Sequence, residues 1–281
     1  MSFQLKILRF YFKLSSAIAP RITAFQAFKL FQRVRKKRVR KREEAFYQRA
    51  RHFKIPAVKE DVHCYELGDV RGPLVFLVHG WESNAGSLSR FAFDLADRGH
   101  RVVSFDLPAH AHARSNYTNL YECKEAFKRV IQFIDPQEPF TVVSHSFGSA
   151  VSTYTLSQLE YQVDKFIFLT SPNSLFEVFS DFKNFVGLSE RSFTYVLGRA
   201  TSLIKEDVRA VNVEEKLKDI SYSKLLLVHD KFDKIIPVRN SEKIQEANTN
   251  KAELKVYNKI GHYRMLWNDH VLKDTLQFIG S

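Results

Sequence analysis

A short segment near the middle of the chain carries serines in a pattern that can support nucleophilic chemistry. Residues 144–148 read Ser-His-Ser-Phe-Gly and directly follow the apolar run Thr141–Val143. A serine on a tight turn between a strand and a helix stands above the sheet, and the N-terminus of the helix favours developing negative charge. Small residues two before and two after Ser146 permit such a turn. Because serines also begin ordinary helices, the segment alone leaves both interpretations open.

Other short segments with titratable side chains also follow apolar runs. His-Gly-Trp-Glu (79–82) follows Leu74–Val78, and a His- and Ala-rich segment (106–115) follows Val102–Phe105. Later in the chain, His229–Pro237 follows Leu225–Val228 and Ile260–Tyr263 follows Leu254–Tyr257. The ends of parallel strands are where ligands bind in open α/β sheets. These segments are therefore the candidates for a functional site.

The elements that would position these segments alternate along the chain. The apolar runs predict strands at 74–78, 102–105, 141–143, 166–169, 225–228 and 254–257, and helical patterns lie between them at 87–98, 120–134, 149–159 and 241–246. Alternation of this kind predicts an α/β fold, with a mostly parallel central sheet and helices on both faces. From about residue 172 to 220 a Phe-rich helical stretch interrupts the strands, and we expect it to form a small lid.

The segments, in this order and at these strand ends, resemble the α/β-hydrolase family over roughly residues 60–281. The family's nucleophile motif is Gly-x-Ser-x-Gly, and Ser144 replaces its first glycine here. The resemblance implies that Ser146 is the nucleophile, His262 the base and Asp233, four residues before Pro237, the acid that orients the base. It also implies that the backbone N–H groups of Trp81 and Phe147 form the oxyanion hole.

Several nearby residues have more ordinary interpretations, which we favour. His79 is expected to tie its loop down, Asp230 to belong to a turn, and His270 to lie on the surface. His110 and His112 lack the additional Cys or carboxylate ligands typical of a metal site, so we expect no metal and no cofactor.

The segment at 106–115 is similar to the family's Asp-x-Pro-Gly-His-Gly-x-Ser loop, with alanine in place of both glycines. If the turn needs positive φ at Ala109 and Ala111, the alanines are strained.

The resemblance implies a serine esterase or lipase that forms an acyl-enzyme on a small-molecule ester. Phenylalanines of the lid, Phe176 and Phe179 among them, together with Trp81, favour an apolar acyl group. Thioester or amide cleavage would use the same residues. The alternative is a catalytically silent fold that binds a membrane surface or a protein partner.

The positive charge of the chain is concentrated at its beginning. Residues 1–54 hold 16 Lys/Arg against two Glu, a net of +14, whereas residues 55–281 have a net of −2. We therefore expect a basic helical extension (1–54), as one long helix or a pair of helices, and a hydrolase domain (55–281). The dense run from Arg33 to Arg42 fits a solvated helix face or an anionic membrane surface better than nucleic acid, because no recognition module accompanies it.

Cysteine content and hydropathy indicate which cellular compartment to expect for the protein. Two cysteines, Cys64 and Cys123, cannot form a disulfide framework, which favours a reducing cytoplasm, with peripheral attachment to the inner membrane face as a further expectation. Ile7–Ala19 resembles a short signal peptide, but Arg9 and Lys13 interrupt its apolar run. We expect no transmembrane helix, because no uncharged apolar stretch reaches about 18 residues.

Overall fold

The computed structural model describes residues 3–35, 37–57 and 60–280, which divide into two compact units. The sheet unit comprises Val34–Asn173 and Val213–Ser281, and the helical unit comprises Met1–Arg33 and Ser174–Asn212. Each unit is therefore built from two separate stretches of chain.

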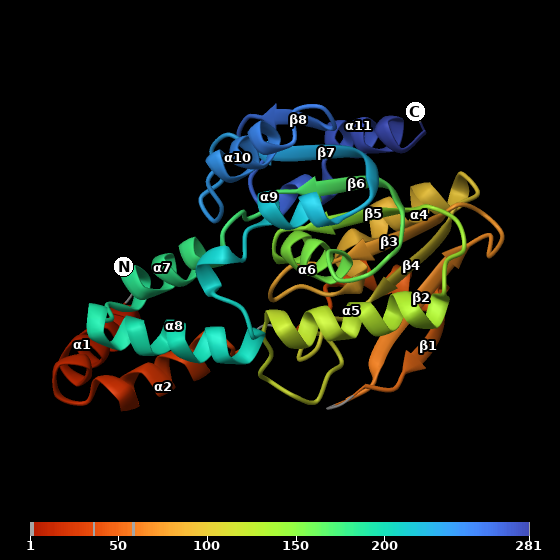
Figure 1. Ribbon diagram of the computed structural model, residues 1–281. Helices are drawn as coiled ribbons and strands as arrows, with labels where there is room; N and C mark the ends of the chain where they lie inside the picture. Colours follow the sequence, from red (N-terminus) through yellow and green to blue (C-terminus); the bar gives the residue numbers. More distant parts are fainter. Residues whose placement is uncertain (1–2, 36, 58–59, 281) are drawn as a thin grey trace. The chain divides into compact units, whose positions relative to one another are not determined.

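The sheet unit is organised around one sheet, which has eight strands within the described residues, in the order β1-β2-β4-β3-β5-β6-β7-β8 (Figure 1). β1 and β2 are antiparallel to their neighbours, and the remaining pairs are parallel. The strands are β1 (Arg51–Ile55), β2 (Val62–Gly68), β3 (Leu74–Val78), β4 (Arg101–Phe105), β5 (Phe140–His145), β6 (Val163–Leu169), β7 (Tyr222–Asp230) and β8 (Ala252–Tyr257).

Helices cover both faces of this sheet (Figure 1). They are α3 (Lys41–Arg49), α4 (Ser89–Asp97), α5 (Leu120–Ile134), α6 (Phe147–Leu156), α9 (Val213–Lys216), α10 (Arg239–Ala247) and α11 (Asp269–Gly280), with short 3-10 turns at Ala85–Leu88, Leu217–Asp219 and Arg264–Trp267. Because side chains alternate along a strand, Val75 and Leu77 of β3 pack in the core formed with α4 and α11. Phe76 lies on the other face, with its ring centroid 5.5 Å from that of Phe127 in α5.

The predicted fold class is confirmed, and all six predicted strands and four predicted helices of this unit are present. The sequence patterns did not reveal β1 and β2. Residues 51–54, which we expected in the extension, lie in β1, where Arg51 bonds to the Glu66 carboxylate of β2.

The expected helical form of the basic run is wrong for residues 34–35 and 37–40, which form no helix. Val34 is buried and donates its N–H to the carbonyl of Asn116. Arg35 pairs with Glu82 at 3.0 Å, and Lys37 donates to the carbonyls of Ala113 and Ser115. Burial of Val34 and these charge-assisted hydrogen bonds hold the run in an irregular strap.

The helical unit joins the beginning of the chain to the predicted lid segment. Its helices are α1 (Phe3–Ile18), α2 (Pro20–Phe31), α7 (Leu175–Val186) and α8 (Glu190–Ile204), with a 3-10 turn at Val208–Ala210. Arg9 of α1 donates to the carbonyls of Asn184 and Phe185, and Phe31 of α2 stacks on Phe179 of α7 with ring centroids 4.4 Å apart. Helices α7 and α8 therefore share their core with α1 and α2.

Candidate active site

Ser146 occupies a strained turn between β5 and α6. Its φ of 54° lies in the left-handed region that non-glycine residues seldom adopt. The N–H of Ser146 donates to the carbonyl of Leu169 at 2.9 Å, which fixes the turn to the end of β6. A Cβ at position 148 would lie 2.4 Å from the carbonyl oxygen of Val78, so only glycine fits there. The crowded backbone explains why small residues flank the serine.

Ser144, which replaces the first glycine of the family motif, has a specific partner. Its Oγ lies 2.7 Å from Oγ of Ser152, and Ser152 donates to the carbonyl of Gly148. Since the Ser152 proton is used in that bond, the Ser144 hydroxyl is the donor to Ser152. The extra hydroxyl therefore ties the end of β5 to the first turns of α6 instead of obstructing the turn.

Three predicted residues from separate strand ends form one hydrogen-bonded chain. Nε2 of His262 lies 3.0 Å from Oγ of Ser146, and Nδ1 of His262 lies 2.7 Å from Oδ2 of Asp233. All three residues are buried. An ionised Asp233 can only accept, so Nδ1 carries the proton and Nε2 is free to accept the proton of the Ser146 hydroxyl. This arrangement can activate the serine oxygen for nucleophilic attack.

The environment of Asp233 keeps its carboxyl group ionised. Burial alone would raise its pKa, but the hydrogen bond with His262 and the N–H groups of Ile235 and Ile236 outweigh burial and hold the pKa below its ordinary value. Those two N–H groups donate to Oδ1 at 2.8 and 3.1 Å, which leaves Oδ2 for His262. The carboxylate is thus fixed in both charge and orientation.

Two further buried residues hold the loop that carries His262. Oδ2 of Asp230 accepts the N–H of Gly261 at 2.6 Å, while its Oδ1 accepts the N–H of Phe232. Nε2 of His145 donates to the carbonyl of His262 at 3.1 Å. Asp230 is thus the turn residue we expected and also bonds directly to the neighbour of His262. The sequence offered no signal for that second bond, because Asp230 and Gly261 are far apart in the chain.

Trp81 and Phe147, the two residues expected to form the oxyanion hole, lie beside the Ser146 turn. Phe147 is the first residue of α6, where backbone N–H groups have no acceptor within the helix. Gly80, before Trp81, approaches so closely that a Cβ there would lie 3.1 Å from the Ser146 Cβ. The rings of Trp81 and Phe147 meet edge to face, with centroids 5.4 Å apart. This geometry can place two backbone donors near an oxygen that is bound at Ser146.

Two neutral histidines tie the Trp81 loop to the loop after β4. His79 donates from Nδ1 to the carbonyl of Gly80 and accepts the N–H of Leu107 at Nε2. His110 donates from Nδ1 to the carbonyl of Pro108 and accepts the N–H of Glu82. Burial lowers the pKa of His79 and lowers that of His110 to about 3. Each lone pair is occupied, which suits the structural role expected of His79 and leaves His110 no electron pair for a metal.

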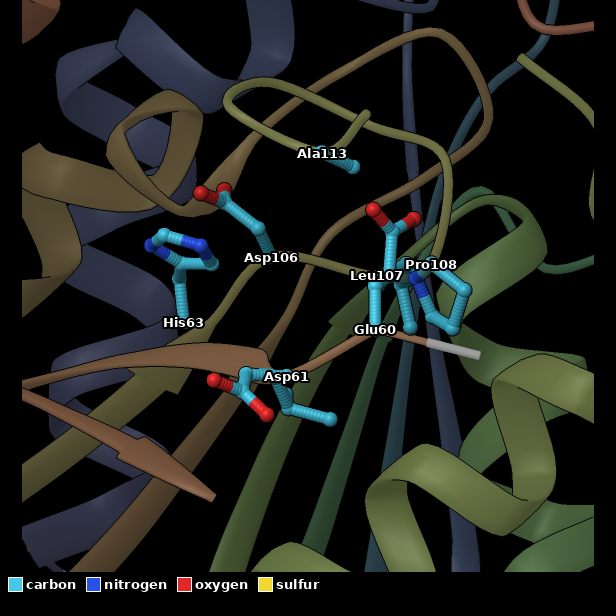
Figure 2. Close-up of a pocket in the computed structure, with 8 residues that line it drawn as sticks. Glu60, Asp61, His63, Asp106, Leu107, Pro108 and Ala113 are labelled. Atoms are coloured by element: carbon cyan, nitrogen blue, oxygen red, sulfur yellow. The ribbon is translucent and has the colours of Figure 1, made fainter. Parts of the chain in front are cut away.

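The loop after β4 has the strain predicted from its alanines. Ala109 and Ala111 have φ values of 66° and 44°. The carboxylate of Glu60 holds this loop by accepting the N–H groups of Ala109, Arg114 and Ser115. Figure 2 shows Glu60 beside Pro108 and below Ala113. Residues 3–35, 37–57 and 60–280 contain no group of three or more His, Cys, Asp or Glu side chains that could hold a metal ion.

The two lid phenylalanines predicted to bind substrate belong to the helical unit. Phe179 is buried there, against the rings of Phe28 and Phe31. Phe176 is partly exposed, and its ring contacts are with Phe193 and the guanidinium of Arg209. Their role in substrate binding stays a prediction. Of the two rings, that of Phe176 is the more accessible.

Comparison with known proteins identifies the fold. A family model described as the alpha/beta hydrolase fold matches residues 73–202. A human (Homo sapiens) protein named serine hydrolase-like protein is 28% identical over 135 residues, which are 46% of this chain and 64% of that protein, less than two thirds of its length.

Solved structures agree with the family model. An esterase of Pyrococcus furiosus superposes with a TM-score of 0.64 at 18% identity, covering 88% of this chain and 94% of the esterase. The thioesterase domain of the curacin biosynthetic pathway gives 0.60 at 18% identity, covering 83% of this chain and 99% of the domain.

Proposed function

The chain has the alpha/beta hydrolase fold, and on that premise we propose that it is a serine hydrolase that cleaves carboxylic esters through an acyl-enzyme intermediate. The hydrogen-bonded chain from Ser146 through His262 to Asp233 is the observation that carries this proposal. Its order along the sequence, serine then acid then histidine, is the order that this fold uses.

In the first half of the proposed reaction, Ser146 Oγ attacks the ester carbonyl while its proton passes to Nε2 of His262. The tetrahedral intermediate collapses, the bond to the alcohol oxygen breaks, and His262 returns the proton to the departing alcohol. Asp233 stabilises the transient imidazolium, because its carboxylate lies 2.7 Å from Nδ1 and is ionised. The product of this half is an ester between the acyl group and Ser146.

In the second half, His262 takes a proton from water, and the resulting hydroxide attacks the acyl-enzyme. His262 then protonates Ser146 Oγ, which releases the carboxylic acid and restores the enzyme. In both halves the carbonyl oxygen becomes negative, and the N–H groups of Trp81 and Phe147 stabilise it. Phe147 is suited to this role because its N–H lies at the positive end of α6.

An apolar acyl group suits the aromatic residues near the serine. Trp81 is partly exposed, and its ring packs between those of Phe147 and His110, with centroid distances of 5.4 and 5.3 Å. An aromatic wall of this kind binds hydrocarbon and offers few polar partners.

Hydrolysis of p-nitrophenyl esters of increasing acyl length tests the proposal. We expect turnover that rises from acetate to a longer chain, and Ser146→Ala should lower kcat by at least about a thousandfold. In the Asp233→Asn variant the imidazole is held in the wrong tautomer, and kcat should fall about 10⁴-fold with little change in KM. If no ester in the series is cleaved, the proposal of ester hydrolysis is wrong.

A further inference from the structure

One face of helix α1 packs inside the helical unit. Phe12 and Ser16 are buried, and the N–H of Ser189 donates to Oγ of Ser16. Together with Arg9, which bonds to the end of α7, these residues define the packed face. The contacts of this packed face hold α1 in the helical unit.

A second face of α1 is apolar and exposed. Phe3, Ile7, Phe10, Leu14 and Ile18 follow one another at spacings of four, three, four and four, which places them along one stripe of a helix with 3.6 residues per turn. Their exposed fractions lie between 52% and 77%, and Tyr11 at 44% borders the same stripe. At 100° per residue, this stripe lies opposite Phe12 and Ser16. We call these six residues the α1 stripe.

The surroundings of the α1 stripe are basic. Residues 1–33 contain Lys6, Arg9, Lys13, Arg21, Lys29 and Arg33 but no Asp or Glu. Lys6 and Lys13 are exposed and, by helical geometry, lie along one flank of the stripe. An apolar stripe with lysines at its edge is typical of helices that lie in the interface of an anionic membrane.

Within the extension, the structure favours α1 as the membrane contact over the basic run that the sequence suggested. Phe28 and Phe31 of α2 stack on Phe179 within the helical unit. In the basic run, Arg35 and Lys37 are engaged by Glu82 and by loop carbonyls. Tyr11 at the border of the α1 stripe donates its hydroxyl to Oε1 of Gln26 in α2, but the other five residues of the stripe are apolar and at least half exposed. None of the described helices is long and apolar enough to cross a membrane.

We propose that the α1 stripe binds the surface of an anionic phospholipid bilayer. The helix lies parallel to the membrane plane, with the stripe among the upper acyl chains and Lys6 and Lys13 at the headgroups. A second copy of the chain is a poorer occupant, because it would bring a second set of six unbalanced positive charges to the same contact. The proposal concerns a surface and does not depend on the ester chemistry.

Vesicle co-sedimentation of the full chain tests this proposal. The Ser146→Ala variant serves as the background, so that lipid hydrolysis cannot change the vesicles. We expect binding to phosphatidylcholine vesicles that contain a quarter phosphatidylglycerol, and weaker binding in 0.5 M salt or without phosphatidylglycerol. On that background, Phe10→Ser with Leu14→Ser should lower the partition coefficient at least about tenfold, since both side chains lose buried hydrocarbon.

A matched pair of substitutions controls for exposed apolar area in general. Val70 and Phe133 are 58% and 59% exposed, and both belong to the sheet unit; Val70→Ser with Phe133→Ser should leave vesicle binding unchanged. Likewise, Lys6→Gln with Lys13→Gln should weaken binding, whereas Lys54→Gln with Lys224→Gln should not. Equal loss in a test pair and its control would overturn the proposal.

Two further results separate the alternatives. If the protein fails to bind vesicles and sediments as a dimer that Phe10→Ser with Leu14→Ser converts to a monomer, the stripe is a protein interface and the lipid proposal is wrong. Hydrolysis of a soluble short-chain ester by protein that retains Ser146 should be unchanged by the α1 substitutions. If the chain with an intact α1 stripe fails to bind the vesicles but still hydrolyses the soluble ester, the membrane proposal alone is contradicted.

Discussion

Asp230 and Gly261 are joined by a 2.6 Å hydrogen bond from the Gly261 N–H to Oδ2 of Asp230. The bond links the end of β7 to the residue before His262, so the segments that carry the proposed acid and base are fastened to each other. Oδ1 of the same carboxylate accepts the N–H of Phe232. Because Asp230 is fully buried, both of its oxygens need these donors.

The Asp230→Asn variant should lose activity through misplacement of His262. Asparagine places an NH2 group where one carboxylate oxygen lies, so one of the two N–H groups loses its acceptor. We expect kcat to fall about 10- to 100-fold with KM nearly unchanged, because the loss concerns the alignment of His262 with Ser146 and not the binding of substrate. Steady-state kinetics on a soluble ester provide the measurement.

Asp69→Asn is the control for this substitution. Asp69 also accepts a backbone N–H two residues ahead, that of Arg71, but it lies in an exposed turn. Its substitution should leave kcat unchanged. Wild-type kcat in the Asp230→Asn variant would show that the bond to Gly261 does not position His262.

Glycine at the two strained alanines should stabilise the protein. Ala109 and Ala111 have positive φ, which costs an L-residue about 1 kcal/mol and costs glycine much less. Ala109→Gly and Ala111→Gly should each raise the free energy of unfolding by about 0.5–1 kcal/mol in urea denaturation. Ala113→Gly in the same loop, where φ is not positive, should lower it instead. Destabilisation by all three would show that backbone strain is not the dominant effect.

Acid should destabilise the sheet unit through its buried histidines. Burial lowers the pKa of His110 and of His145 to about 3, against 6.5 for an exposed imidazole. The unfolded chain therefore takes up protons below pH 6.5, whereas the folded chain does not until about pH 3. The stability from these two residues is full above pH 6.5 and declines by about 1.4 kcal/mol per pH unit for each histidine as pH falls toward 3.

One variant tests whether His145 contributes to the decline of the unfolding free energy with falling pH. Urea denaturation at pH 7.5, 6.5 and 5.5 should give a shallower decline for His145→Gln, whose side chain does not titrate. His270→Gln, at an exposed position, should retain the wild-type slope. An unchanged slope in His145→Gln would mean that His145 is already protonated in the folded protein.

The parts of the fold that could be predicted from sequence are those with strong local patterns. Buried parallel strands such as β3 are almost purely apolar, and the residues that end them stand at one edge of the sheet. This allowed Ser146, Asp233 and His262 to be selected from three distant segments, and the structure brings them within hydrogen-bonding distance. The strain at Ala109 and Ala111 was likewise predictable, because glycine is the usual residue there in the family.

The features that sequence did not reveal depend on contacts between distant segments. β1 is largely exposed and carries Arg51 and Lys54, so its sequence resembles the basic helical segment before it. Its pairing with β2, where Glu66 binds Arg51, is a contact that the local sequence does not indicate. The α1 stripe could not be distinguished from the packed face of the same helix. The packing of α1 against α2 and α7 decides which face of α1 is buried.

The most direct test of the central claim is reaction with a fluorophosphonate, which phosphonylates an activated serine and is located by peptide mass spectrometry. We predict that the wild-type protein gains one adduct, on Ser146, and that Ser157→Ala, a change elsewhere at the end of α6, gains the same adduct. The Ser146→Ala variant should gain none. A folded wild-type protein that remains unlabelled, or equal labelling of Ser146→Ala, would contradict the account.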